Sequence, residues 1–235
     1  MFQVEEARAE FREELGIKMP VDEAFDLYAN NSYVTTLVMS PSYVEEAVVG
    51  FLVGSRIASS PRDILGIARN ERRVEVKLKG EPRRPRLFVD DCVGLVERGA
   101  PVRSRLKVDR ETFWEAVGDF EERNRFHGVQ AAGIYEVSSR RGIVAFDVSR
   151  FSSVAKAIGA LLISGLDPGS AVAIASGRIS SDLVSMVANS GIPILVGFKS
   201  LLYGGFRSAA LLGLTLVLVR GGEAKVLTYP ERVEL

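Results

Sequence analysis

The 235-residue sequence contains one cysteine and one histidine, and this scarcity excludes several kinds of site. A structural zinc site usually takes four cysteine or histidine ligands, and a catalytic zinc takes at least three protein ligands. Cys92 and His127 cannot supply either set, so we predict that the protein binds no metal directly. A single cysteine also forms no disulfide within the chain. A Ser-His-Asp or Cys-His catalytic centre would depend on the same histidine, and no G-x-S-x-G turn accompanies it.

The sequence also lacks an excess of either charge and any hydrophobic run long enough to cross a membrane. Thirty Lys and Arg balance thirty Asp and Glu, which argues against a general nucleic-acid-binding protein. The longest apolar run, residues 209–219, falls short of the roughly 20 residues that a transmembrane helix needs. Residues 5–14 are rich in Glu, unlike a signal peptide, and the predicted location is therefore the cytoplasm. Neither a P-loop nor a G-x-G-x-x-G motif is present.

Within this balance, the basic residues are concentrated in one segment. Residues 69–107 hold 12 basic and 6 acidic residues, whereas residues 1–68 hold 5 basic and 11 acidic ones. The basic segment could attract an anionic ligand, or it could be a solvated loop. The sequence leaves both interpretations open.

What the sequence does contain is a strand-helix-strand pattern between residues 143 and 178. An apolar run at 143–146 is followed by a helical pattern over 154–162 and by a second apolar run at 171–175. This order is typical of the unit that builds parallel sheets. Polar residues follow both strands, at 147–150 and at 176–178. Because ligands bind at the carboxyl ends of strands in open α/β sheets, we predict a ligand crevice here.

The remaining chain predicts two lobes. Val4, Ala7, Phe11 and Leu15 have helical spacing and predict a short amphipathic helix over residues 3–15. Other local signals are a hairpin turn at Asn30-Asn31, a helix start at Ser40-Pro41, a helix cap at Asp109, and alternating helices and strands after residue 180. We therefore expect an α/β protein with a small β-rich lobe over 1–108, which includes a mobile loop around Cys92, and a larger α/β lobe over 109–235.

An ordered set of short segments resembles the FdhD family, the formate dehydrogenase accessory sulfurtransferases. The segments are TLVMSP at 36–41, EEAVVGFL at 45–52, GVQAA at 128–132, DVSR at 147–150, SGRIS at 176–180, GIPILV at 191–196, GLTL at 213–216 and TYPER at 228–232. Each is weak alone, but their order is specific, and the resemblance extends from about residue 22 to residue 233.

The resemblance implies both a fold and a function. The larger lobe would be an α/β sandwich similar to the cytidine-deaminase fold without its zinc. The protein would take sulfur from a cysteine desulfurase to molybdopterin guanine dinucleotide, which supplies the sulfido ligand that formate dehydrogenase or a related molybdoenzyme needs. The resemblance to the family further implies that the protein is a homodimer.

The departures from the family pattern fall on residues that carry chemistry. The family has a Cys-x-x-Cys pair where this chain has Cys92 and Leu95, and a histidine where Gln130 stands. Asp147, Arg150 and Lys156 match the family's segment, which otherwise loses its histidine, asparagine and second aspartate here.

These comparisons give a set of candidate site residues. Cys92 is the candidate sulfur-carrying nucleophile, since a thiolate could accept a persulfide sulfur; it could also be a small apolar residue at a strand end. The candidate cofactor-binding residues are His127, Gln130, Asp147, Arg150, Lys156, Ser176, Gly177 and Arg178. Two alternatives stay open: residues 176–178 could be a capped turn, and Asp147, Arg150 and Lys156 could be a structural ion-pair set.

Two functions are compatible with these candidate residues. The first is an FdhD-like sulfur carrier that binds molybdopterin guanine dinucleotide. The second is a module of the same fold that holds the cofactor or a related nucleotide without transferring sulfur, which the missing second cysteine favours. A deaminase is a distant third, because the zinc ligands that it would need are absent.

Overall fold

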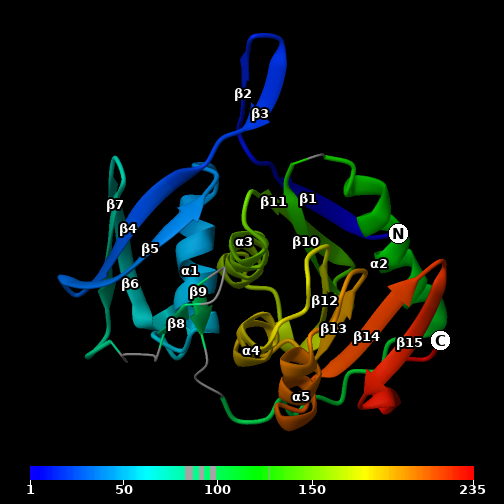
Figure 1. Ribbon diagram of the computed structural model, residues 1–235. Helices are drawn as coiled ribbons and strands as arrows, with labels where there is room; N and C mark the ends of the chain where they lie inside the picture. Colours follow the sequence, from blue (N-terminus) through cyan, green and yellow to red (C-terminus); the bar gives the residue numbers. More distant parts are fainter. Residues whose placement is uncertain (83–86, 90–92, 96–98, 127) are drawn as a thin grey trace.

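The computed structural model describes residues 1–82, 87–89, 93–95, 99–126 and 128–235, and its largest element is a seven-stranded mixed sheet (Figure 1). The strands lie in the order β1 (Gln3–Ala7), β11 (Arg141–Asp147), β10 (Gln130–Glu136), β12 (Ala171–Ala175), β13 (Ile194–Gly197), β14 (Thr215–Arg220) and β15 (Glu223–Thr228). β1, β11, β12, β13 and β14 run in one direction, while β10 and β15 are antiparallel to their neighbours. The predicted strands at 143–146 and 171–175 are therefore parallel, with β10 between them.

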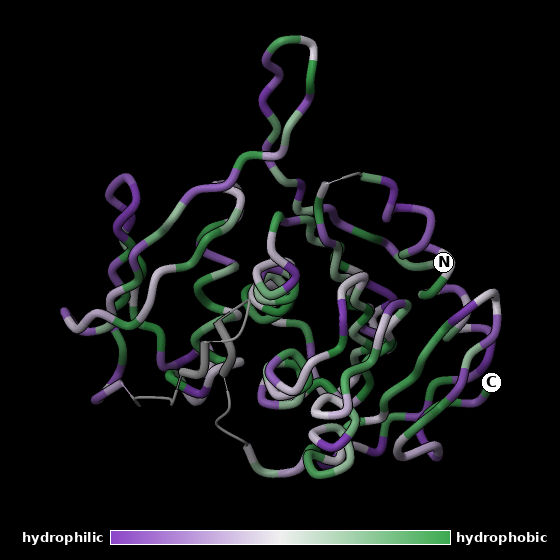
Figure 2. Tube along the Cα trace, viewed as in Figure 1, coloured by the Kyte–Doolittle hydropathy of each residue, from purple (hydrophilic) through white to green (hydrophobic). Residues whose placement is uncertain are grey.

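Helices cover both faces of this sheet. α2 (Arg110–Arg123) packs on one face, and α3 (Arg150–Ile163), α4 (Ser181–Asn189) and α5 (Tyr203–Leu211) contribute to the core on the other. Successive side chains of a strand point to opposite faces, so Val172 and Ile174 of β12 join the α2 core while Ala173 and Ala175 join the α3 core. Figure 2 shows the strands as mostly hydrophobic, as expected for a sheet that is covered on both sides. The predicted α/β class is confirmed.

A second, four-stranded sheet lies beside the first. Its order is β5 (Ser32–Met39), β4 (Glu23–Ala29), β7 (Arg73–Leu78) and β6 (Ile64–Asn70), and α1 (Val44–Gly54) packs against it. The hairpin predicted at Asn30-Asn31 is confirmed, because both residues adopt positive φ angles between β4 and β5. Smaller elements are the 3₁₀ turns η1 (Pro61–Asp63), η2 (Pro168–Ser170) and η3 (Pro230–Arg232), and the short strands β8 (Leu87–Val89) and β9 (Val93–Leu95).

The two sheets share one hydrophobic core, and α1 and α3 form the contact between them. The two helices cross at Gly50 and Gly159, where an added Cβ on Gly159 would lie 1.8 Å from the carbonyl oxygen of Glu46. A Cβ on Gly50 would lie 1.9 Å from the carbonyl oxygen of Ala155. Glycine is therefore required at both positions, since any side chain would force the helix backbones apart.

The predicted helix over residues 3–15 is wrong. Residues 3–7 form β1, which pairs in parallel with β11 of the large sheet, and residues 11–20 form the hairpin of β2 (Phe11–Glu14) and β3 (Ile17–Pro20). Pairing with a strand about 140 residues away outweighs the local helical spacing, and the positive φ angles of Leu15 and Gly16 form the hairpin turn. The lobe division at residue 108 stays a prediction, and β1 belongs to the sheet otherwise built by residues 130–228.

The predicted helix start at Ser40-Pro41 is also wrong in position. α1 begins at Val44, with Tyr43 at the N-cap, and Ser40 is fully buried at the end of β5. By contrast, Asp109 caps α2 as predicted, because its side chain accepts a hydrogen bond from the Thr112 N–H. No helix in the described part of the chain is both long and apolar enough to span a bilayer.

Candidate functional site

The candidate residues that the structure describes gather at one edge of the large sheet. The carboxyl ends of β11, β12 and β13 meet there with the amino end of β10, as the strand directions require. Gln130 opens β10 and is the register partner of Asp147, which ends β11. Residues 176–178 follow β12 directly. The topology therefore places Asp147 and residues 176–178 at the carboxyl ends of strands, as the sequence predicted.

Asp147 and Lys156 form a fully buried ion pair at this edge. Lys156 Nζ lies 2.6 Å from Asp147 Oδ2, and neither side chain is exposed to solvent. The local fold explains the contact: Ser149 caps α3, and Lys156, in the second turn, points back toward the helix N-terminus. Burial raises the pKa of Asp147, while the Lys156 ammonium pulls it down; burial likewise lowers the pKa of Lys156, opposed by Asp147.

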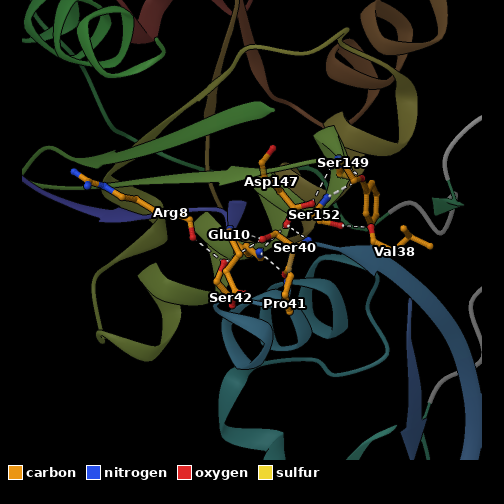
Figure 3. A network of polar contacts seen from close by, with 12 residues as sticks. Arg8, Glu10, Val38, Ser40, Pro41, Ser42, Asp147, Ser149 and Ser152 are labelled. Carbon is orange, nitrogen blue, oxygen red and sulfur yellow. Dashed lines mark hydrogen bonds and ion pairs between the residues drawn. The ribbon is translucent and has the colours of Figure 1, made fainter. Parts of the chain in front are cut away.

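Ser40 joins this ion pair to the rest of the molecule (Figure 3). Its backbone N–H donates to Asp147 Oδ2 at 3.1 Å, and its carbonyl oxygen accepts from Lys156 Nζ at 3.0 Å. Its hydroxyl accepts from the backbone N–H of Glu10 at 2.8 Å. The Ser149 N–H donates to the remaining oxygen, Asp147 Oδ1, at 2.9 Å. The network therefore connects the end of β5, the N-terminal segment and the start of α3.

This geometry separates two candidates from the others. The side chains of Asp147 and Lys156 are occupied by each other and by Ser40 and Ser149, so the structure supports the ion-pair interpretation for these two. Arg150 belongs to a different environment: it is half-buried and its side chain packs against Gly177. The sequence could not separate these roles, because all three residues lie in one matched segment.

Gln130, Arg150 and Gly177 are in direct proximity. A Cβ added to Gly177 would lie 2.9 Å from Arg150 Cβ and 3.4 Å from Gln130 Oε1, so the backbone after β12 passes close to both side chains. Ser176 is buried and continues the sheet, because its hydroxyl accepts from the Ala131 N–H at 2.8 Å. The next residue along, Arg178, is exposed. These contacts form a close-packed turn with one arginine half-buried and one free to reach solvent.

Two further residues, which were not among the candidate site residues, complete the edge. Lys199 is exposed and follows β13, so a cation stands after each of β11, β12 and β13. Ser180 is the N-cap of α4 but makes no capping hydrogen bond, and its buried hydroxyl has no hydrogen-bond partner among the described residues. A helix N-terminus with its uncapped N–H groups, near several cations, is suited to an anion. For Lys199, its position two residues after the buried apolar strand β13 was the available signal.

Two candidates cannot be placed. Cys92 and His127 lie outside the described residues, as do Arg83, Arg84, Arg86 and Arg98 of the basic segment. Over the ranges that the structure describes, no group of three or more His, Cys, Asp and Glu could hold a metal ion, and the absence of a directly bound metal stays a prediction.

Comparison with known proteins identifies the family. The FdhD/NarQ family model matches residues 20–234, nearly the whole chain. The chain belongs to this family. The "Sulfur carrier protein FdhD" of Sulfolobus acidocaldarius is 29% identical, over 92% of this chain and 90% of its own. The protein of the same name from Methanothermobacter thermautotrophicus is 26% identical, over 83% of this chain and 82% of its own.

A solved structure supports the fold. The crystal structure of a proposed formate dehydrogenase accessory protein from Desulfotalea psychrophila superposes with a TM-score of 0.71 at 21% sequence identity. The match covers 96% of this chain and 97% of that one. The family match confirms the FdhD resemblance found in the sequence, and the structural match shows that the likeness in fold extends over both sheets.

Proposed function

We propose that this protein is a sulfur carrier in the maturation of formate dehydrogenase or a related molybdoenzyme. Membership of the FdhD/NarQ family and the names of its relatives support this role. The protein takes sulfur from a cysteine desulfurase and delivers it to molybdopterin guanine dinucleotide. Cys92 carries the only thiol of the chain, and its Sγ atom accepts the sulfur.

The observation that carries the ligand part of this proposal is the cationic edge of the large sheet, by which we mean Arg150, Arg178, Lys199 and the α4 N-terminus. Guanidinium groups bind phosphate oxygens with two parallel hydrogen bonds, and helix N–H groups add further donors. The unpartnered Ser180 hydroxyl offers one more polar group at the same place. Asp147 does not oppose an anion here, because Lys156 neutralises it.

The sulfur step is a thiol-persulfide exchange. The Cys92 thiolate attacks the outer sulfur of the donor persulfide, a new S–S bond forms at Cys92, and the donor S–S bond breaks to release the donor's thiolate. No second cysteine is present to convert the Cys92 persulfide into an internal disulfide. The sulfur therefore leaves only by transfer to the acceptor.

An alternative function is a module that binds the cofactor without carrying sulfur. Leu95, at the position of the family's second cysteine, favours it. The two functions share the cationic edge and differ in whether Cys92 takes up sulfane sulfur.

We expect GDP, which carries the guanine and the phosphates of the dinucleotide, to bind at the cationic edge. Arg178→Ala should weaken binding by about tenfold, since a charge-assisted hydrogen bond contributes roughly 1.5 kcal/mol or more. Isothermal titration calorimetry measures both affinities. Arg110→Ala is the matched control, because Arg110 is exposed at the start of α2, and it should leave binding unchanged. Equal losses in the two variants, or no binding of GDP by the wild type, would contradict the assignment of the phosphate site.

A further inference from the structure

Helix α5 buries small residues and exposes large apolar ones. Its buried residues are Gly205, Ser208 and Ala209. A Cβ on Gly205 would lie 2.6 Å from the carbonyl oxygen of Ile179, so the start of α5 packs too closely against the segment before α4 to admit a side chain there. A helix on the surface of a protein usually turns its large apolar residues toward the core. In α5 this pattern is reversed.

The outward apolar residues of α5 form one surface. Tyr203, Phe206 and Ala210 are spaced by three and four residues and therefore share a side of the helix. Tyr203 is 74% exposed and Phe206 is 38% exposed, and Leu202 and Leu211 at the two ends of the helix are exposed as well. We call these five residues the α5 face. Single exposed apolar residues are ordinary, but a group on one element is typical of an interaction surface.

The α5 face adjoins the cationic edge of the large sheet. α5 packs beside α4 (Figure 1), and Ile179, next to Arg178 of the edge, forms backbone hydrogen bonds with the segment before α5. The Ile179 N–H donates to the Ser200 carbonyl oxygen at 3.0 Å, and its carbonyl oxygen accepts from the Leu202 N–H at 3.0 Å. Lys199 of the edge precedes Leu202 by three residues. A protein that approaches a ligand at the strand ends therefore comes close to the α5 face.

The charge of this surface favours an acidic partner. Arg207 is exposed on the same side of α5 and forms no ion pair with the part of the chain that the structure describes. α5 itself contains no acidic residue. Two carboxylates lie at the borders, Asp182 in the first turn of α4 and Glu231 two residues after Tyr229, whose hydroxyl donates to an α5 carbonyl oxygen. The centre is therefore cationic and apolar, and it complements an apolar surface that carries carboxylates.

We propose that the α5 face is the docking surface for the molybdoenzyme that receives the cofactor, an inference that rests on the function proposed above. The sulfur donor has to reach Cys92, whereas the acceptor has to reach the ligand at the strand ends, which the α5 face adjoins. Tyrosine, phenylalanine and arginine are residue types enriched in protein interfaces. The acceptor presents apolar side chains to Tyr203 and Phe206 and a carboxylate to Arg207.

A binding titration tests this assignment. The probe is the catalytic subunit of formate dehydrogenase from the same organism, purified without its cofactor, and biolayer interferometry measures its affinity. Tyr203→Ser and Arg207→Glu should each weaken binding by about tenfold or more, as expected for residues at the centre of an interface. Tyr33→Ser and Arg110→Glu are the matched controls. Tyr33 is exposed on β5 and Arg110 at the start of α2, so these two changes should leave the affinity at the wild-type value.

The same variants separate this inference from the proposed function. All four should bind GDP and take up sulfur like the wild type, because none changes Cys92 or the cationic edge. A wild type that takes up sulfur but does not bind the enzyme, or α5 variants that bind it as well as the controls do, would overturn the docking surface alone. Variants that instead lose affinity for the desulfurase, or whose mass by light scattering falls, would assign the α5 face to the donor or to a second copy and would also overturn it. Docking through the α5 face without sulfur uptake would contradict the carrier function only.

Discussion

Gly159→Ala is expected to destabilise the protein by about 3 kcal/mol, the upper end of the usual cost of overpacking. The new methyl group would lie 1.8 Å from the carbonyl oxygen of Glu46, and a backbone atom inside a helix cannot move aside alone. α1 and α3 would have to separate along their crossing, which opens the core shared by both sheets. Urea unfolding followed by circular dichroism measures the change as a lower midpoint at an unchanged slope.

Gly118→Ala supplies the matched control. Gly118 lies in the interior of α2 and is exposed, and a Cβ there would meet nothing within 4 Å. Alanine is favoured over glycine in such a position by roughly 0.5–1 kcal/mol, so this variant should be more stable than the wild type. Similar effects of the two substitutions would show that α1 and α3 do not approach as closely as the structure indicates.

Lys156→Met is expected to cost about 3–5 kcal/mol, because it leaves the Asp147 carboxylate buried without its cation. Methionine retains much of the length and apolar character of the lysine side chain, so the loss comes mainly from the charge. The double variant Asp147→Asn, Lys156→Met should recover most of the stability, since no buried charge remains. A double variant as unstable as the single one would mean that packing, rather than the unpaired charge, causes the loss.

The pH dependence of Lys156→Met gives an independent check. Burial already raises the pKa of Asp147, and the loss of the Lys156 ammonium raises it further. A carboxyl whose pKa is higher in the folded state than in the unfolded state favours folding at low pH, and this contribution is lost as the pH rises through the folded pKa. The deficit relative to the wild type should therefore shrink between pH 7 and pH 4. A constant deficit over this range would contradict the buried-charge explanation.

The sequence predicted the fold well where local signals and tertiary pairing agree. Asn30-Asn31 marks a hairpin because both residues tolerate positive φ angles, and Asp109 marks a helix start because its side chain satisfies a free N–H group. The strand at 171–175 is recognisable as a short continuous apolar run, because a strand covered on both faces of its sheet buries every residue. In these cases a few neighbouring residues determine the outcome.

The prediction failed where a distant partner decides the structure. The spacing of Val4, Ala7 and Phe11 fits a helix, yet β1 gains its hydrogen bonds from β11, which no local pattern reveals. Ser40 resembles a helix cap, but its position is determined by Asp147 and Lys156, more than 100 residues later in the chain. The site shows the same limit: the sequence placed Asp147, Arg150 and Lys156 in one group, and only the three-dimensional contacts separate the buried pair from the half-buried arginine.

The uptake of sulfur by Cys92 tests the central claim most directly. The protein is incubated with a cysteine desulfurase and cysteine, and its intact mass is then measured without reductant. A sulfur carrier should gain one sulfur atom per chain, and Cys92→Ser should gain none while it still binds GDP with wild-type affinity. A wild-type protein that binds GDP but takes up no sulfur would contradict the carrier function and leave the binding module in its place.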